Sequence, residues 1–151
     1  MCGIIGGITN KDIKPLLLDG LKRLEYRGYD SSGLVVLSKN NTFNRTRSVG
    51  KVKNLEEILK SKDQKIKGNI GLAHTRWATH GEPSVSNAHP HISMNSVSLV
   101  HNGIIENYLE LKNDQLKKGY SFSSETDTEV IAHAIDFALK ASKTFLSSVQ
   151  D

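Results

Sequence analysis

The sequence predicts a mixed α+β domain whose strands pair largely antiparallel. Apolar runs of strand length follow one another with short turn segments between them, and helical apolar stripes fall between these runs at uneven intervals. The composition, with 37% hydrophobic and 24% charged residues, is that of an ordinary globular protein. At 151 residues the chain can bury most of its apolar surface within one domain, which we assign to residues 1–151.

Continuous apolar runs predict the strands. The first, residues 1–8, is expected to be short and buried, because its glycines let other backbone come close. The remaining predicted strands cover residues 33–37, 42–49, 69–74 and 97–101. A long loop is expected over residues 75–94.

Capping residues and helical spacing predict five helices. They begin near Asp12, Asn54, Tyr108, Asp127 and Thr144, and the first three end near Gly28, Lys60 and Gly119. The start at Asn54 rests on a capping box with Glu57, and Asp127 is expected to cap the fourth helix. The core-facing residues expected on that helix are Val130, Ile131, Ala134, Ile135, Ala138 and Leu139.

Charge and composition exclude several classes of protein. The net charge is +4, from 20 Lys+Arg against 16 Asp+Glu. The lysines lie on helical faces without the interleaved aromatic residues of a nucleic-acid-binding surface. No apolar run approaches the ~18 residues that span a bilayer, and no signal-peptide pattern is present. From the lysine distribution and the lack of a long apolar run, we expect neither a nucleic-acid nor a membrane partner. A single cysteine excludes an internal disulfide and favours the cytoplasm.

The only cysteine, Cys2, directly follows the initiator Met1. Removal of Met1 places a thiol and a free α-amine on one residue. The ordinary pKa of an α-amine is about 7.7–8 and that of a thiol about 8.5, so the amine can accept the thiol proton near neutral pH. This arrangement is typical of hydrolases with an N-terminal nucleophile. A small buried cysteine in a core strand is the alternative, and the commoner one for a lone cysteine.

Three polar stretches lie at predicted element ends, where sites are usually built. Arg76 can grip a carboxylate through two parallel hydrogen bonds and Trp77 can cover a small ligand, but a surface ion pair and local packing explain this pair equally well. Asn102 and the Gly103 N–H can form an oxyanion hole, although Asn-Gly is also a common turn dipeptide. Asp127 can cap a helix, hold a ligand ammonium group, or do both.

Six histidines raise the question of a zinc hydrolase. They are His74, His80, His89, His91, His101 and His133. The sequence has neither a His-Glu-x-x-His pattern nor paired cysteines, which favours hydrogen-bonded structural histidines in loops. We therefore expect no metal and no cofactor.

Five stretches together resemble the glutaminase domain of the glutamine–fructose-6-phosphate aminotransferase family. They are residues 2–4 (CGI), 23–33 (RLEYRGYDSSG), 74–81 (HTRWATHG), 101–107 (HNGIIEN) and 124–129 (SETDTE). The first is shared by class II glutamine amidotransferases in general, whereas the second and third point to this family. The resemblance runs from Cys2 to the end of the chain.

This resemblance implies an N-terminal-nucleophile hydrolase fold, an αββα sandwich of antiparallel sheets covered by helices. It also implies that Cys2, after loss of Met1, attacks the side-chain amide of L-glutamine with its own α-amine relaying the proton. Asn102 and the Gly103 N–H would stabilise the tetrahedral oxyanion, and Arg27 would orient the terminus.

The resemblance also implies how the substrate is held. Arg76 would bind the carboxylate of glutamine and Asp127 its ammonium group. Trp77, Thr79 and His80 would belong to the loop that closes over it.

Members of this family continue through the rest of the glutaminase domain and two sugar isomerase domains. Residues 1–151 would then be the N-terminal part of the glutaminase domain, and the sandwich is expected to be incomplete at its C-terminus. The ammonia would serve glucosamine 6-phosphate synthesis from fructose 6-phosphate in the full-length enzyme. A sugar isomerase domain or a complementing chain is the expected partner, with a homo-oligomer as a further expectation. The alternative is an inactive remnant or binding module that keeps this sequence.

Overall fold

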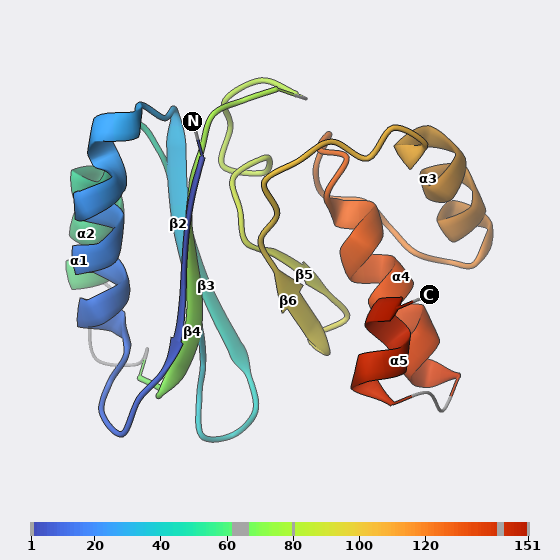
Figure 1. Ribbon diagram of the computed structural model, residues 1–151, viewed down its shortest axis with the longest axis horizontal. Helices are drawn as coiled ribbons and strands as arrows, with labels where there is room; N and C mark the ends of the chain where they lie inside the picture. The colour runs from blue at the N-terminus through green and yellow to red at the C-terminus, as the bar shows by residue number, and fades with distance from the viewer. Residues whose placement is uncertain (1, 62–66, 80, 142–143, 151) are drawn as a thin grey trace.

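The computed structural model describes residues 2–61, 67–79, 81–141 and 144–150, which form two antiparallel sheets flanked by helices (Figure 1). The strands are β1 (Gly3–Ile8), β2 (Ser31–Leu37), β3 (Phe43–Val49), β4 (Ile70–Arg76), β5 (His91–Ser93) and β6 (Val97–Leu99). The helices are α1 (Lys14–Leu24), the short 3-10 turn η1 (Glu25–Arg27), α2 (Val52–Ser61), α3 (Tyr108–Lys117), α4 (Glu129–Lys140) and α5 (Phe145–Gln150).

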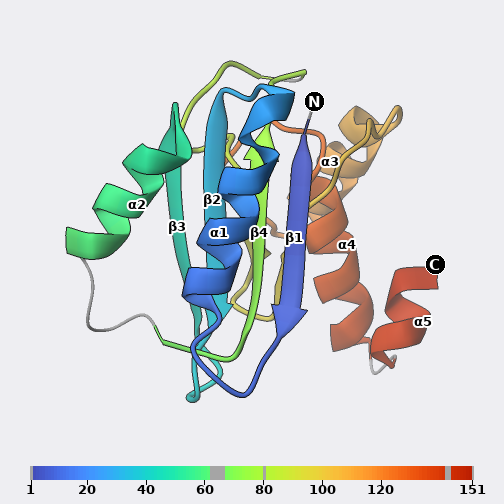
Figure 2. The same ribbon diagram turned by 60° about the vertical axis from the view of Figure 1, so that its left-hand side comes forward.

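The elements stack in layers. The larger sheet has the strand order β1-β4-β2-β3, and β5 pairs with β6 in the smaller one. Helices α1 and α2 cover one face of the larger sheet, as Figure 2 shows from the helix side. The β5–β6 hairpin lies on the opposite face, and α3, α4 and α5 lie beyond it (Figure 1). The predicted α+β fold with antiparallel sheets is therefore confirmed.

The main core lies between α1, α2 and the larger sheet. Its buried side chains are Ile13, Leu17, Leu21, Leu34, Val36, Val52, Leu55, Leu59 and Ala73. Fully burying a large aliphatic side chain contributes roughly 1.5–3 kcal/mol, so truncating Leu17 or Leu21 would open a costly cavity. Helix α1 has Pro15 in its first turn, as expected, and gives way to η1 before Gly28. Its N-cap is Ile13, so Asp12 is not the capping residue.

Strand β4 sends alternate side chains to the two layers. Gly71 and Ala73 face α1, since Ala73 is part of the main core and a Cβ on Gly71 would meet Leu17. His74, one residue further on, stacks its ring on His89 in the opposite layer, with ring centroids 4.3 Å apart. The pleat therefore directs His74 and Arg76 of β4 away from the helices and toward the second layer.

The segment between β4 and β5 is held tightly against the larger sheet. Arg47 of β3 donates from Nη1 to the carbonyls of Ser86 and Ala88, each at 2.8 Å. Burial lowers the pKa of Arg47 to about 10. A Cβ at Gly33 of β2 would lie 2.2 Å from the carbonyl oxygen of His89, so only glycine permits this approach.

The strand predictions needed two corrections. Strand β1 is an edge strand that pairs with β4 alone among the described residues, and Ile8 is 77% exposed. The expected buried strand is thus half exposed. The expected loop over residues 75–94 contains β5, which is too short to produce a periodic signal. The other predicted strands are present with shifts of a few residues at their ends.

The helix predictions also needed corrections at their N-termini. Helix α2 begins at Val52, and Asn54 lies inside it, donating from Nδ2 to the Val49 carbonyl at 3.1 Å. Helix α4 has Thr128 as its N-cap, so Asp127 is not the capping residue. Helices α3 and α5 lie where they were predicted, and no helix within the described residues is long and apolar enough to cross a membrane.

The buried face of α4 is more polar than predicted. Val130 is buried as expected, but Ala134 is exposed. Glu129 and Asp136 take buried positions instead. Each finds a hydrogen-bond donor there: Ser124 Oγ donates to Glu129 at 2.6 Å, for example. A prediction from the spacing of apolar residues misses a buried helix face whose polar side chains form hydrogen bonds with nearby residues.

Candidate active site

A pocket of about 690 Å³ opens at one end of the two sheets. It lies where β1 begins, where β4 ends, and where the chain leaves β6 and enters α4. Its walls are formed by Cys2, Arg27, His74, Arg76, Trp77, Thr79, His89, His101, Asn102, Gly103, Ile104, Thr126, Asp127 and Thr128. Eight of the nine site residues predicted from the sequence are among them, and the ninth, His80, lies outside the described residues.

The Cys2 thiol lies on the wall of this pocket, just before β1. The backbone N–H of Trp77 donates to Cys2 Sγ at 3.2 Å. Arg27 donates from Nη1 to the Cys2 carbonyl oxygen at 3.4 Å. Cys2 is only partly buried, so the alternative of a core cysteine does not fit. A cysteine held by backbone contacts with its sulfur against an open pocket is placed to react with a bound ligand.

The segment after η1 fixes the end of β4 next to Cys2. The N–H of Asp30 donates to the Arg76 carbonyl at 2.8 Å, and the Asp30 carboxylate accepts from the Ala78 N–H. Gly28 has a φ of +73°, and a Cβ there would lie 2.8 Å from the Trp77 ring. Glycine is therefore favoured at this position on both conformational and steric grounds.

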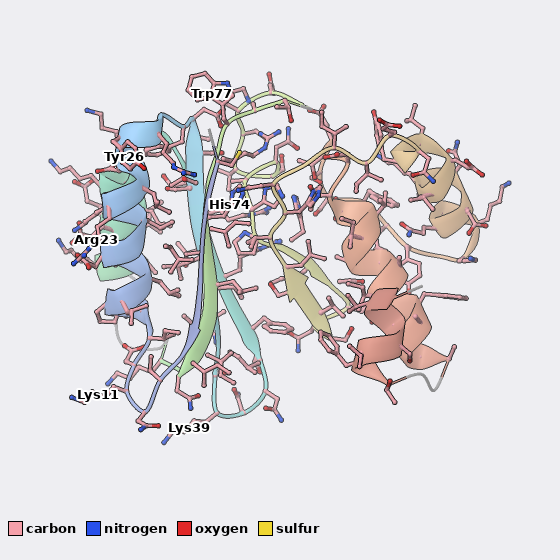
Figure 3. The ribbon with its side chains drawn as sticks, in the orientation of Figure 1. Lys11, Arg23, Tyr26, Lys39, His74 and Trp77 are labelled. Atoms are coloured by element: carbon pink, nitrogen blue, oxygen red, sulfur yellow. The ribbon has the colours of Figure 1, made fainter. Side chains whose placement is uncertain are left out.

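Trp77 and His74 lie at different depths around the pocket. Figure 3 shows Trp77 at the outer edge of the molecule, beyond the end of the larger sheet, and His74 further in, between that sheet and the second layer. Trp77 is 53% exposed, whereas His74 is fully buried. An exposed indole at the rim can cover a small ligand, as the sequence suggested.

Arg76 brings a buried positive charge to the pocket wall. Arg76 is 4% exposed, and its side chain donates to the carbonyls of Gly81 and Glu82, each at 3.4 Å. The guanidinium therefore helps to hold the loop that follows β4. It is the type of group that binds carboxylates most specifically.

Asp127 brings a buried negative charge to the same pocket. It is 4% exposed, and its Oδ2 accepts the backbone N–H of Ile105 at 2.7 Å. This bond ties the segment after Asn102 and Gly103 to the start of α4. A carboxylate has about four lone-pair sites, so Asp127 can hold this N–H and accept from a ligand as well.

Asn102 and Gly103 line the pocket between β6 and α3. The chain bends at Gly103, as the turn alternative for Asn-Gly expects, but it does not turn back into a strand. Asn102 Oδ1 lies 2.6 Å from His74 Nε2. A Cβ on Gly103 would lie 2.5 Å from the His101 ring, so a larger residue would displace that ring from the pocket wall.

Three buried histidine rings contact one another in a row, and two of them, His74 and His89, line the pocket. The His89 ring centroid lies 4.3 Å from that of His74 and 4.5 Å from that of His91. Burial lowers the pKa of His74 to about 4 and that of His91 to about 3, and it lowers the pKa of His89 strongly. All three imidazoles are therefore neutral at pH 7.

The histidine predictions were only partly right. His74 lies in β4, as the predicted strand over residues 69–74 had it, but His91 lies in a strand and not in a loop. Neither ring nitrogen of His89 has a hydrogen-bond partner among the described residues. No group of three or more His, Cys, Asp and Glu in the described part of the chain could hold a metal ion.

Sequence reasoning also missed several residues of the pocket wall. His74 was detectable, because it lies two residues before Arg76 and a strand places such residues on one face. Thr126 and Thr128 flank Asp127 within the 124–129 stretch and were detectable in the same way. His89 carries no comparable signal, since the path of the loop brings it to the pocket.

Comparison with known sequences places the chain next to enzymes that use glutamine. Residues 60–143 match the glutamine amidotransferase domain family. The chain is 53% identical over 151 residues to the glutamine–fructose-6-phosphate aminotransferase [isomerizing] of Acinetobacter baylyi, and 54% identical over 151 residues to that of Buchnera aphidicola. These alignments cover 100% and 99% of this chain but 24% of each relative, so the chain spans about a quarter of their length.

Two solved structures share the fold. The glutamine phosphoribosylpyrophosphate amidotransferase from B. subtilis, complexed with ADP and GMP, superposes with a TM-score of 0.76 at 24% identity, over 99% of this chain and 31% of that one. An allosteric regulatory enzyme of purine biosynthesis gives 0.77 at 26% identity, over 97% of this chain and 32% of that one. These similarities confirm the predicted N-terminal-nucleophile hydrolase fold.

Proposed function

This chain belongs to the glutamine amidotransferase domain family, and from that membership we propose that it hydrolyses the side-chain amide of L-glutamine, with Cys2 as the nucleophile. One observation carries the proposal: the Cys2 thiol shares a pocket with a buried guanidinium, Arg76, and a buried carboxylate, Asp127. Arg76 matches the α-carboxylate of an amino acid, and Asp127 matches its ammonium group. Amide chemistry needs such a grip on both charged ends beside a nucleophile.

The first step forms a thioester. After removal of Met1, the α-amine of Cys2 takes the thiol proton, and the thiolate attacks the side-chain carbonyl carbon of glutamine. The carbonyl oxygen becomes an oxyanion, which the Asn102 amide and the Gly103 N–H stabilise. The Trp77 N–H, which donates to Cys2 Sγ at 3.2 Å, holds the sulfur in place for this attack.

The second step releases the products. The ammonium of Cys2 returns its proton to the amide nitrogen, the C–N bond breaks, and ammonia leaves. The same amine then takes a proton from water, which attacks the thioester and frees glutamate and the thiol. Each proton taken is returned, so the terminus ends the cycle in its starting form.

The loop after β4 would control access to the substrate. Arg76 holds the loop carbonyls of Gly81 and Glu82, so carboxylate binding at Arg76 is coupled to the loop. Trp77 at the rim and Thr79 on the wall would then cover the bound glutamine, together with His80. Exclusion of water from the pocket protects the thioester until ammonia has left.

In a longer protein, this chain would serve as the N-terminal part of a glutaminase domain. Relatives four times its length are named for transfer of an amino group to fructose 6-phosphate. We propose that the ammonia is used there to form glucosamine 6-phosphate in a sugar isomerase domain, on the same chain or a complementing one. A free, reactive thiol fits a reducing compartment, the cytoplasm.

The test is glutamate release from L-glutamine by the protein and by its Cys2→Ala variant. We expect release that depends on Cys2 and that L-asparagine, shorter by one methylene, does not support. Activity that survives Cys2→Ala would contradict the nucleophile. Absence of any release from a folded protein would favour the alternative, an inactive binding module.

A further inference from the structure

We infer that His74 is a positioning residue for this reaction: its Nε2–H holds the Asn102 side chain so that the Asn102 NH2 group faces the substrate. The inference rests on the proposed function and deepens it. Neither the sequence motifs nor the family match assigns His74 a role. It acts through Asn102 and has no bond to make or break in the reaction.

The contact itself is short and protected. His74 Nε2 lies 2.6 Å from Asn102 Oδ1, and His74 is fully buried. His74 belongs to β4, whose backbone is paired on both sides, with β1 and with β2. Asn102, in contrast, lies in the segment that joins β6 to α3. A rigid strand thus provides the donor that orders a side chain on a connecting segment.

The orientation of the Asn102 amide decides what it can do. An asparagine amide has an acceptor end, Oδ1, and a donor end, Nδ2, that differ little in shape. If Nδ2 faces the substrate, it donates to the developing oxyanion. If Oδ1 faces the substrate, its partial negative charge repels the same oxygen. A donor that binds Oδ1 from behind selects the productive orientation.

The surroundings of His74 keep it suited to this task. Burial is the main reason that its pKa falls to about 4, and the nearby positive charge of Arg76 acts in the same direction. The imidazole is therefore neutral at pH 7 and carries one N–H. The His89 ring, 4.3 Å away, packs against that of His74 and restricts its rotation.

The kinetic test compares two replacements of His74. His74→Leu removes the donor, and His74→Gln retains an N–H near the position of Nε2. We expect His74→Leu to lower kcat for glutamine hydrolysis roughly 10- to 100-fold, somewhat less than the ~10²–10³ that loss of an oxyanion-hole donor costs. KM should change little, because Arg76 and Asp127 remain. His74→Gln should recover a large part of kcat.

The control is His133→Leu. His133 is also a buried histidine with one hydrogen bond to a side-chain oxygen, Ser93 Oγ at 2.8 Å, but it does not line the pocket. We expect this variant to lose stability and keep kcat. Equal loss of kcat in His133→Leu and His74→Leu would mean that His74 acts only through stability.

A double-mutant cycle shows whether His74 acts through Asn102. In an Asn102→Ala background, His74→Leu should lower kcat no further. An additive loss would overturn the inference, as would unchanged kcat in His74→Leu. If the wild-type protein shows no Cys2-dependent release, the proposed function fails instead.

Nitrogen NMR of the imidazole provides a readout that needs no activity. At pH 7 we expect the ring nitrogen signals of His74 to be those of a neutral imidazole with its proton on Nε2. These signals are assigned to His74 by their absence from the spectrum of His74→Gln. A proton on Nδ1 would present a lone pair to Asn102 and would overturn the inference.

Discussion

Arg76 and Asp127 each combine a structural contact with a charge that faces the pocket. Arg76 donates to two carbonyls of the loop after β4, and Asp127 accepts a backbone N–H from the segment after β6. Both are almost completely buried, where unscreened charge attracts an opposite charge strongly. A ligand that binds either residue would therefore also affect the position of the backbone segment to which that residue is hydrogen-bonded.

Replacing Arg76 by Ala should raise the KM for glutamine roughly 10- to 100-fold, since a hydrogen bond to a charged group contributes about 1.5–3 kcal/mol. Steady-state kinetics measure the change. The matched control is Arg23→Ala, because Arg23 is an exposed arginine on α1 that forms an ion pair with Asp19, one turn earlier on the same helix. Unchanged substrate saturation in Arg76→Ala would contradict its assignment to the carboxylate.

Replacing Asp127 by Asn should weaken glutamine binding and leave the fold intact. The amide oxygen of Asn can still accept the Ile105 N–H. The Thr128 hydroxyl, which donates to the other carboxylate oxygen of Asp127 at 3.4 Å, can accept from the amide NH2 group instead, so loss of the charge is the main change. Glutaramic acid, which is glutamine without its α-amino group, separates the two charged ends. Asp127→Asn should leave its inhibition constant unchanged, whereas Arg76→Ala should raise it. Equal effects of Asp127→Asn on both compounds would exclude an ammonium contact.

At the scale of elements, the pleat of β4 places the site. Its alternation sends Ala73 into the main core and His74 and Arg76 toward the second layer. This much could be predicted, because period-2 spacing and polar strand ends are visible in the sequence. The polar buried face of α4 and the short strand β5 could not, because each depends on partners brought together by the fold.

The same distinction holds for individual site residues. Cys2, Asn102 and Arg76 belong to motifs and could be found by pattern. The exposure of β1 was missed because three isoleucines indicate burial unless the neighbouring strands are known. Asp127 was expected to cap α4, but Thr128 is the N-cap. The Asp127 carboxylate accepts the backbone N–H of Ile105 instead.

Gly33→Ala tests the close approach of the β4–β5 segment to the sheet. The added Cβ would lie 2.2 Å from the His89 carbonyl, which is backbone and cannot swing aside. We expect a loss of about 1–3 kcal/mol in the free energy of unfolding, measured in urea. Gly6→Ala in β1 is the control, since its Cβ would meet only the flexible Leu72 side chain at 3.1 Å. Equal stability of the two variants would contradict the close approach.

At the scale of the whole molecule, the two sheets enclose a polar interior between them. The layer between α1, α2 and the larger sheet is aliphatic, whereas the interface with the second layer contains the row of His74, His89 and His91. Neutral imidazoles fill this interface without the cost of buried charge. The stability of the molecule should therefore depend on pH.

The free energy of unfolding should fall as the pH is lowered from about 6.5 to 4. The folded-state pKa values of His74 and His91 lie near 4 and 3, below the ordinary 6.5, so in this window the unfolded chain binds protons that the folded chain does not. Each such histidine contributes up to about 1.4 kcal/mol per pH unit. Urea titrations across this range measure the slope, and His91→Gln should reduce it. A stability independent of pH between 7 and 5 would show that these imidazoles are not buried.

The most direct test of the account is acid quenching of the protein during turnover with L-glutamine, followed by mass measurement of its N-terminal peptide. We predict a γ-glutamyl group on Cys2, in thioester linkage, on peptide that begins with Cys2 and lacks Met1. Turnover of glutamine without any acyl group on Cys2, or with Met1 still attached to the active form, would contradict the account.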